Sequence, residues 1–281
     1  MNAEAGRSSK ALVTAVWILG FMLIWEAGAF AVAGVKRTPE NVLPHIHQIV
    51  LSVFSAKPVS NRMTAAEIVA VNAGATLLRA GLGLVFGALF GFALAVLMHL
   101  SKLIERIAFP YLTIIQMIPI LGIAPIVLAV TGSIDKSRVA IAAILTFYPV
   151  AVNTLAGFKA IEKERLELMY SYAAGRRATY TKTLIPFCVP YLFTGLKIAA
   201  PMAITASILV DTLQGDGGLG CMLSQSLKHA MSIYVFWQIV FFSAAVGILS
   251  FVLMGAAEKL FLPQKRKRRR AVAEARGEAA K

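Results

Sequence analysis

Long apolar stretches recur along the chain, separated by shorter polar segments. Six of them have about 20 residues or more, enough for a helix to cross about 30 Å of hydrocarbon. Helices are expected because lipid offers no hydrogen-bond partners, so the backbone N–H and C=O groups must bond within each segment. The alternating pattern of a membrane β-strand is absent. We predict spans at Ala11–Gly34, Thr76–Met98, Ile107–Val130, Val139–Phe158, Phe193–Asp211 and Ile233–Ala256. The pattern therefore predicts an all-α polytopic membrane protein with six transmembrane helices.

Composition agrees with this prediction. Of the 281 residues, 58% are hydrophobic and only 15% are charged, whereas a soluble domain has about 25% charged residues. This balance argues against a soluble enzyme fold and excludes disorder for most of the chain. The first stretch exceeds the core of a signal peptide, so we expect it to remain as an anchor. Cys188 and Cys221 have no metal-site spacing and are predicted on opposite sides of the membrane, so no disulfide is expected.

The basic residues predict the orientation. Segments 1–10, 99–106, 159–192 and 259–281 hold 19 Lys and Arg residues, and the alternating segments hold 7. Positive loops remain on the cytoplasmic side, so both termini are predicted inside. We divide the chain into a cytoplasmic N-terminus (1–10), a transmembrane domain (11–256) and a basic cytoplasmic tail (257–281). The net charge of +14 owes much to Lys265–Arg270, which we assign to lipid headgroups rather than to nucleic acid.

Three segments outside the spans have a structure of their own. Residues 43–56 predict an amphipathic helix on the outer surface, and the glycines of 215–220 predict a sharp turn. In the cytoplasmic loop 159–192, apolar residues recur at helical spacing, and Gly175 is the predicted stop. A second short helix, 176–184, is predicted to end before Pro186. The apolar stripe of the first loop helix is expected to pack against another surface. That surface belongs either to a partner protein or to the rest of this chain.

Four charged residues lie within the predicted spans. For Glu26 we favour a packing or interfacial role over a contact in a polar pathway. Arg79 and Lys197 lie near span ends, where their side chains are expected to reach the headgroups. Asp211 has two open interpretations, which are a lining of the translocation path or gate and an ordinary helix end in water.

The third predicted span contains two prolines that interrupt its hydrogen bonding. Pro119 and Pro125 free carbonyl groups that must face protein or a water-filled cavity at that depth. A bent solute pathway would satisfy this requirement, and so would a packing kink. Gln116 and Met117 lie nearby and are our candidate solute contacts.

Small residues in the second span predict close helix packing. Gly83, Gly87 and Gly91 are spaced by four, and we favour packing within the chain over a seam between two chains. His45 and His47 are two residues apart on the presumed outer helix and would not share a face, so no metal site is predicted.

The cytoplasmic loop resembles a known signature. From Glu167 it runs through Ala173 and Gly175 to Ile185-Pro186, and this resembles the loop of permease subunits of binding-protein-dependent ABC importers. That loop starts Glu-Ala-Ala, has Gly six residues after the Glu and ends in Leu-Pro. Here Leu168 and Met169 replace the alanines, Ala173 replaces the glycine, and Gly175 follows two positions late. Further motifs resemble importers of nitrate, taurine, alkanesulfonates and thiamine precursors; they are Pro190-Tyr191, Gly195-Leu196 and Gly217-Gly218-Leu219-Gly220.

The resemblance implies an importer in the bacterial inner membrane. Two such permease chains, as a homodimer, would join two ATPase subunits and an outer solute-binding protein. The implied contacts with the ATPase are Glu167, Leu168, Met169, Ala173, Gly175, Arg176, Arg177 and Pro186, and the implied outer turn is Gly217, Gly218 and Gly220. The chain has no phosphate-binding loop, so this subunit is expected to be non-catalytic and without cofactor, with ATP–Mg on the partner.

The resemblance implies only a broad class of solute, and the charged residues of the spans bear on the rival functions. We expect a small polar solute, either an anion or a vitamin precursor. A proton-coupled secondary transporter is the alternative, but it would require more buried carboxylates than Glu26 alone. An intramembrane enzyme would require a convergent catalytic set, and the spans contain none.

Overall fold

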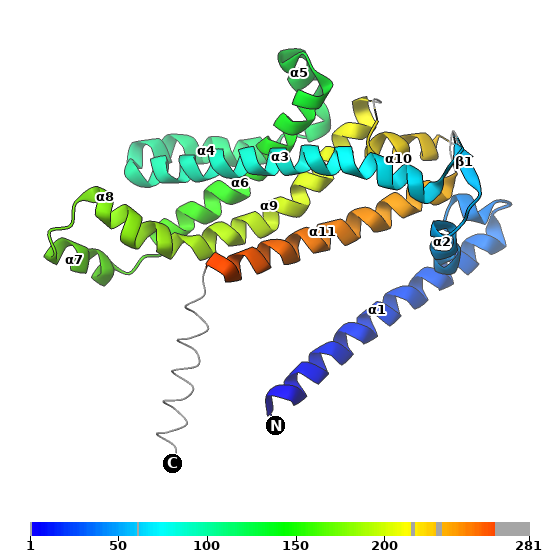
Figure 1. Ribbon diagram of the computed structural model, residues 1–281, viewed down its shortest axis with the longest axis horizontal. Coiled ribbons are helices and arrows are strands. Elements are labelled where there is room, and N and C mark those ends of the chain that lie inside the picture. Colours follow the sequence, from blue (N-terminus) through cyan, green and yellow to red (C-terminus); the bar gives the residue numbers. More distant parts are fainter. Residues whose placement is uncertain (1, 61, 215–216, 229–231, 262–281) are drawn as a thin grey trace. The chain divides into compact units, whose positions relative to one another are not determined.

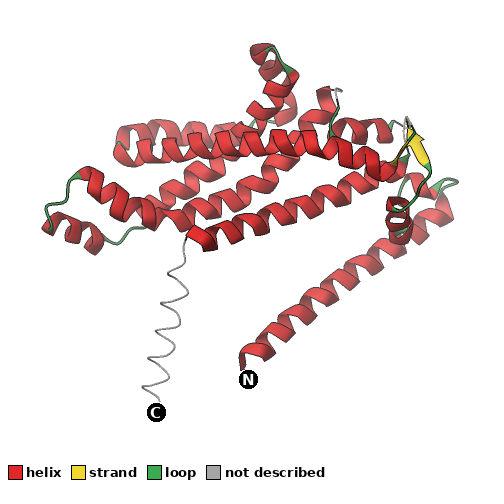
Figure 2. Cartoon of the chain, in the orientation of Figure 1, coloured by secondary structure: helices red, strands yellow, loops and turns green. Residues whose placement is uncertain are grey.

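The computed structural model describes residues 2–60, 62–214, 217–228 and 232–261. Almost all of these residues are helical, and one short antiparallel strand pair is present among them (Figures 1 and 2). The elements are α1 (Asn2–Val35), the 3₁₀ turn η1 (Pro39–Asn41), α2 (Ile46–Val53), β1 (Pro58–Ser60), β2 (Met63–Thr64), α3 (Ala65–Leu100), α4 (Lys102–Met117), α5 (Ile120–Thr131), α6 (Ile134–Lys159), α7 (Lys163–Ser171), α8 (Arg176–Thr179), the π-helical turn η2 (Tyr180–Leu184), α9 (Ile185–Gln214), α10 (Leu219–Leu227) and α11 (Ile233–Phe261). The basic block of the predicted tail lies outside the described residues.

Among the described residues, five helical stretches are long and apolar enough to cross a membrane. They are Leu12–Val35, Ala65–Leu100, Ile134–Lys159, Arg176–Leu213 and Ile233–Phe261. A sixth span exists if α4 and α5 are counted as one bent pair. The all-α polytopic class predicted from the hydrophobic pattern is confirmed.

The predicted third span is not a straight helix. Its two halves meet at an angle of 112°, and the break lies at Ile118 and Pro119. Ile118 is extended, with ψ of 124°, because the ring of a following proline disfavours the helical conformation. Pro119 then caps α5, whereas Pro125 lies inside α5 without interrupting it. Only one of the two prolines therefore breaks the span.

The chain divides into two compact units. The first contains the described parts of 1–72 and 222–241, and the second those of 73–221 and 242–281. In the first unit, the indole of Trp25 packs edge-on against Trp237 at 4.9 Å between ring centroids. Its Nε1 donates a hydrogen bond of 3.0 Å to the carbonyl oxygen of Pro44. These contacts fix α1 against the entry to α2 and against the start of α11.

The outer helix is present, but it is shorter than predicted, and its histidines differ from expectation. His45 precedes α2 as its N-cap, in an extended conformation with φ of −64° and ψ of 145°. Its ring is stacked with that of His47 at 5.4 Å between centroids. The expectation that these two side chains point apart is wrong, because it placed both residues inside the helix.

In the second unit, α3 and α6 pack through the glycine stripe. A Cβ atom at Gly87 would collide with the Thr146 side chain, and one at Gly91 would lie 2.7 Å from the Phe147 carbonyl oxygen. The hydroxyl of Thr146 donates to the carbonyl of Gly83 at 3.2 Å. Small residues thus bring the two backbones together within one chain, as predicted. Since the facing positions increase together along both helices, α3 and α6 run parallel.

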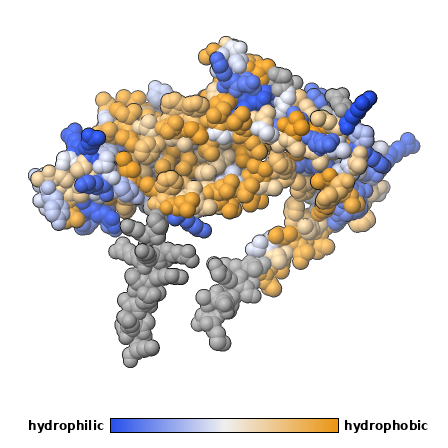
Figure 3. Space-filling model, in the orientation of Figure 1, coloured by the Kyte–Doolittle hydropathy of each residue, from blue (hydrophilic) through white to orange (hydrophobic). Residues whose placement is uncertain are grey.

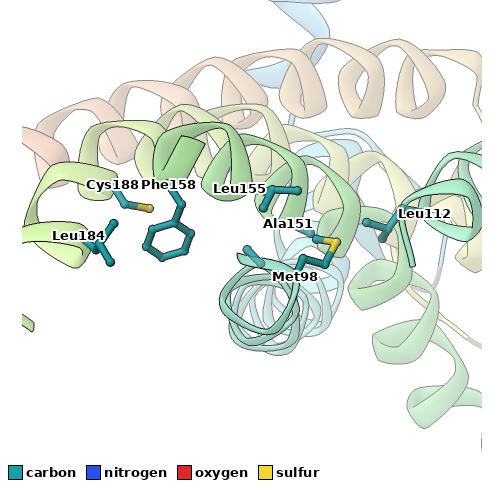
Figure 4. Close-up of a cluster of buried hydrophobic side chains, with 8 residues drawn as sticks. Met98, Leu112, Ala151, Leu155, Phe158, Leu184 and Cys188 are labelled. Carbon is teal, nitrogen blue, oxygen red and sulfur yellow. The ribbon is translucent and has the colours of Figure 1, made fainter. Parts of the chain in front are cut away.

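Helix α9 runs antiparallel to α6 on the same core. A Cβ at Gly195 would lie 2.7 Å from the carbonyl oxygen of Pro149, and one at Gly157 would meet the ring of Tyr191. One hydrophobic cluster lies where α3, α4, α6, η2 and α9 meet (Figure 4). Its buried members are Ala95, Met98, Leu112, Ala151, Leu155, Phe158, Leu184 and Cys188. Hydrophobic side chains dominate the surface over α3, α9 and α11, whereas hydrophilic ones gather around α7 and α8 (Figure 3).

The second loop helix does not end before Pro186, contrary to the prediction. From α8 the chain continues through η2 into α9 without a break. In η2 the backbone N–H of Ile185 bonds to the carbonyl of Tyr180, five residues back. Pro186 lies in the first turn of α9, where a missing N–H costs little because the wider π turn precedes it.

Candidate functional site: an exposed loop helix and a buried charge cluster

Helix α7 has no buried residue. Leu168 is 55% exposed, Tyr170 88% and Tyr172 76%. Such large apolar and aromatic side chains usually mark an interaction surface when they gather on one exposed element. The predicted stripe itself is only partly covered by the described residues of its own chain, since Leu166 is 37% exposed and Met169 is half-buried.

The base of the loop is anchored to the helical core. The ring of His99 in α3 stacks on that of Phe158 in α6, with 5.0 Å between the ring centroids. It also packs edge-to-face with the ring of Tyr180, with 5.8 Å between the centroids. Lys159 at the end of α6 forms an ion pair with Glu105 of α4. A displacement of the loop base would therefore act directly on α3, α4 and α6.

The end of α7 is a Schellman motif built on an alanine. Ala173 has φ of +48°. Its N–H bonds to the carbonyl of Tyr170 at 2.8 Å, and the N–H of Ala174 bonds to that of Met169 at 3.0 Å. These are the two bonds that define the motif, whose left-handed position favours glycine. The predicted stop at Gly175 is wrong, since Gly175 is the N-cap of α8 with φ of −64°.

We expect Ala173→Gly to stabilise the end of α7. A left-handed alanine carries a strain of about 1–2 kcal/mol, while the added freedom of glycine in the unfolded chain costs about 0.4–1 kcal/mol. The net gain should slow amide hydrogen exchange in α7 a few-fold, as measured by mass spectrometry on the purified protein. Ala174→Gly is the matched control, and it should speed exchange because the φ of Ala174 is not positive. Equal effects of the two substitutions would contradict the assignment of strain to Ala173.

The other predicted coupling residues surround α7. Glu167, Arg176 and Arg177 are exposed, and the guanidinium of Arg165 lies 5.4 Å from the ring centroid of Phe187 on α9. Arg165 also pairs with Glu162 at 2.8 Å. This side chain therefore links α7 to the start of α9 and to the residue before α7.

The second candidate site is a cluster of charged residues in the N-terminal half of α3, at the N-terminal end of α6 and in the C-terminal part of α9, and its central pair is buried. Asp211 and Arg138 are both fully buried, with 2.9 Å between Oδ1 of Asp211 and Nε of Arg138. Arg79 lies 3.4 Å from the same oxygen and 2.9 Å from Asp135. The hydroxyl of Thr76 donates to Oδ2 of Asp211 at 2.7 Å. Two arginines and one hydroxyl thus compensate the buried carboxylate.

This cluster corrects two interpretations from the sequence. Asp211 is not a helix end in water, because its side chain has no exposed surface. Arg79 does not reach towards headgroups, because it pairs with Asp211 and Asp135. Lys197 differs in the same way, since its Nζ lies 2.5 Å from Glu258 on α11. In each case a partner on another helix offers a better site for the charge than the membrane surface does.

The glycine turn closes over the carboxylate. Gly217 and Gly218 have φ of +72° and +90°, as a sharp turn requires. A Cβ at Gly218 would collide with the Asp211 carboxylate, and one at Gly220, the second residue of α10, would lie 2.7 Å from the Thr212 nitrogen. The carbonyl of Gly217 accepts a bond of 3.2 Å from Arg138. Gly217 and Gly218 therefore form a turn that contacts the charge cluster, whereas residues 215–216 of the predicted turn lie outside the described residues and Gly220 is already helical.

Three residues of this cluster were not predicted from the sequence: Arg138, Asp135 and Thr76. Arg138 was placed just outside the fourth predicted span and counted only as a loop charge. A signal was available, because Thr76, Arg138 and Asp211 all fall at span ends predicted on the same side. Charges at neighbouring ends on one side can pair, and this would have indicated the cluster.

A cavity of about 810 Å³ lies beside the cluster. Its walls come from α3, α4 and α6 and are mainly apolar. Arg79 of α3 and Asp135 and Lys136 of α6 line one end of it, and Phe90 and Phe147 line it further along these helices. It therefore has one charged end and a long apolar wall.

The predicted solute contacts lie outside this cavity. Gln116 and Met117 are exposed at the end of α4, next to Ile115, which lines the cavity. Pro119 and Pro125 are exposed as well. Their role in a solute path remains a prediction.

Apolar helices of spanning length, joined by an exposed helical loop that is anchored in their core, define a polytopic membrane permease. Residues 83–262 match the model of the family described as binding-protein-dependent transport system inner membrane component. The chain belongs to this family of ABC importer permeases.

Curated relatives agree with the family assignment. The chain is 30% identical over 261 residues to the formylaminopyrimidine transport permease ThiX of Halalkalibacterium halodurans, covering 93% of this chain and 99% of that protein. It is 23% identical over 260 residues to the nitrate import permease NrtB of Synechocystis sp., covering 92% of each.

Solved structures share the fold. One is an amino acid ABC transporter with histidines, with a TM-score of 0.55 and 20% identity over 71% of this chain and 94% of that one. Another is the inward-facing methionine ABC transporter MetNI, with a TM-score of 0.62 and 15% identity over 69% and 96%. These similarities support the all-helical permease fold.

Proposed function

We propose that this chain is the non-catalytic permease subunit of an importer in the bacterial inner membrane, with its N- and C-termini in the cytoplasm. Two copies would form the translocation path, and two separate ATPase subunits would bind ATP–Mg. An outer solute-binding protein would deliver the solute. The observation that carries this proposal is α7, a helix with no buried residue on a loop whose base contacts the core.

The proposed coupling works through that base. A groove on the ATPase would hold α7 by Leu168, Met169 and the neighbouring tyrosines, and the loop arginines Arg176 and Arg177 would face acidic groups. Closure of the ATPase would then move η2, whose Tyr180 contacts His99 of α3. The displacement would reach the spans without requiring any nucleotide site in this chain.

We place the solute path along the second unit. The bent pair α4–α5 would contribute Gln116, Met117, Pro119 and Pro125, and the cavity between α3, α4 and α6 would contribute its charged end. The relatives are named for formylaminopyrimidine and nitrate, so the proposed solute is small and polar, either an anion or a vitamin precursor. The role proposed for Asp211 is to hold the turn at Gly217, Gly218 and Gly220 in one position.

Uptake into vesicles tests the proposed function. The permease would be reconstituted with its ATPase and binding protein, and accumulation of labelled candidate solutes would be measured. We expect accumulation only with ATP and a catalytically active ATPase, and none with an ATPase that lacks its catalytic glutamate. Accumulation driven by a proton gradient without the ATPase would instead support a secondary transporter.

A further inference from the structure

Three possible metal ligands meet in the first unit, where α1 contacts the entry to α2. They are Glu26 of α1, His45 at the N-cap of α2 and His47 in its first turn. Each offers one ligand atom, and these atoms all lie within 4.8 Å of one another. The helix cap explains the geometry, because the extended backbone of His45 turns its ring back towards His47.

Two of the three side chains are held in place by other contacts. One carboxylate oxygen of Glu26 accepts a bond of 2.9 Å from the N–H of Ile46, and the other lies 2.5 Å from Nδ1 of His45. The ring of Phe30 packs edge-on against His45 at 4.8 Å. In metal sites, neighbouring groups commonly hold the ligating side chains in position by contacts of this kind.

The contact between α1 and the entry to α2 gives His45 a structural role, but it gives none to His47. The bond between Glu26 and His45 already joins the two elements. His47 is exposed and stacks on His45 at 5.4 Å between centroids, which brings a second imidazole nitrogen near the same carboxylate.

We propose that Glu26, His45 and His47 form a site for a divalent transition-metal ion, with Zn²⁺ as the best match. Two imidazole nitrogens and one carboxylate oxygen are a common three-residue set for zinc, which binds such ligands at about 2.0–2.2 Å and fills its fourth position with water. Binding contracts the spacing between ligand atoms to about 3.3 Å by rotation of the side chains. The ion joins α2 to α1 more firmly than the hydrogen bond alone, and this inference does not depend on the proposed transport function.

The test is metal binding by the full chain carrying no polyhistidine tag. Purified in detergent and treated with a chelator, it would be titrated with Zn²⁺ in competition with a chromophoric indicator. We expect one high-affinity Zn²⁺ per chain and no competition by Mg²⁺, which prefers oxygen ligands. Zn²⁺ should also raise the unfolding temperature, because it binds the folded state.

Substitutions identify the ligands. His47→Gln leaves the bond between Glu26 and His45 intact and should weaken Zn²⁺ binding by more than about 100-fold, the upper end of the effect of losing a second-shell partner. Glu26→Gln should weaken it comparably. The controls are His99→Gln and Glu67→Gln, which remove a histidine and a carboxylate elsewhere and should leave the affinity unchanged.

Three results would overturn the proposal. They are no Zn²⁺ binding by the wild-type chain at micromolar metal, wild-type affinity in His47→Gln, and equal losses in the ligand and control variants. A thermal shift by Zn²⁺ that persists in His47→Gln would count against it in the same way.

Discussion

Replacing Asp211 with asparagine is expected to destabilise the protein by about 3–5 kcal/mol, because it removes the buried carboxylate partner of Arg138 and leaves only the exposed carboxylate of Asp135, 3.4 Å away. Arg138 and Asp211 are both fully buried and lie 2.9 Å apart. Removing one partner of such a pair costs far more than the pair itself contributes. The loss would be measured as a lower unfolding temperature and lower yield in detergent.

A second ion pair in the same unit provides the matched control. Lys197 and Glu258 are each 23% exposed, so water compensates part of their charge and Glu258→Gln should cost only about 1 kcal/mol. The double variant Asp211→Asn with Arg138→Met should recover much of the loss, since it buries no unpaired charge. Similar losses for Asp211→Asn and Glu258→Gln would show that burial of Asp211 and Arg138 does not set the cost.

Placing proline at Met169 is expected to abolish binding of the ATPase while membrane insertion remains normal. Proline inside a helix costs about 3 kcal/mol, since it removes one hydrogen bond and clashes with the preceding turn. Helix α7 has only nine residues and no buried side chain to compensate, so it should unfold. Co-purification of the ATPase with the permease from membranes measures the effect.

Lys163→Pro is the control for this variant. Lys163 is the first residue of α7 and follows Glu162, whose φ of −64° and ψ of 135° are suited to a position before proline. Proline is well tolerated at the first helical position, so this variant should bind the ATPase normally. Co-purification of Met169→Pro at the wild-type level would contradict the role of α7 in docking.

The loop illustrates how far the sequence could be interpreted. The spacing of Leu166, Met169 and Ala173 predicted a helix, and α7 is that helix. Its end was placed at Gly175 because glycine usually occupies the left-handed position. In the structure Ala173 occupies it, since the bonds to Tyr170 and Met169 hold that conformation despite its strain. The left-handed position prefers glycine by only about 1 kcal/mol, so the residue type alone does not identify it. The hydrogen bonds around the position, which the structure shows, are needed as well.

The charged residues show the opposite limit. Arg79, Lys197 and Asp211 were assessed one at a time, each against water or headgroups. Their actual partners are on other helices. Each of the three has a partner that lay outside the predicted spans, which is Asp135, Glu258 or Arg138 respectively.

The sequence by itself determined the class of this protein, its apolar helices, the glycine contact of the second span and the first helix of the loop 159–192. These properties follow from length, hydrophobicity and periodicity, which act within one segment. Only the tertiary structure decided that Asp211 is buried between two arginines and that Glu26, His45 and His47 converge. Those properties depend on which residues from distant segments become neighbours, and the energy of a charge inside a protein is set by these neighbours.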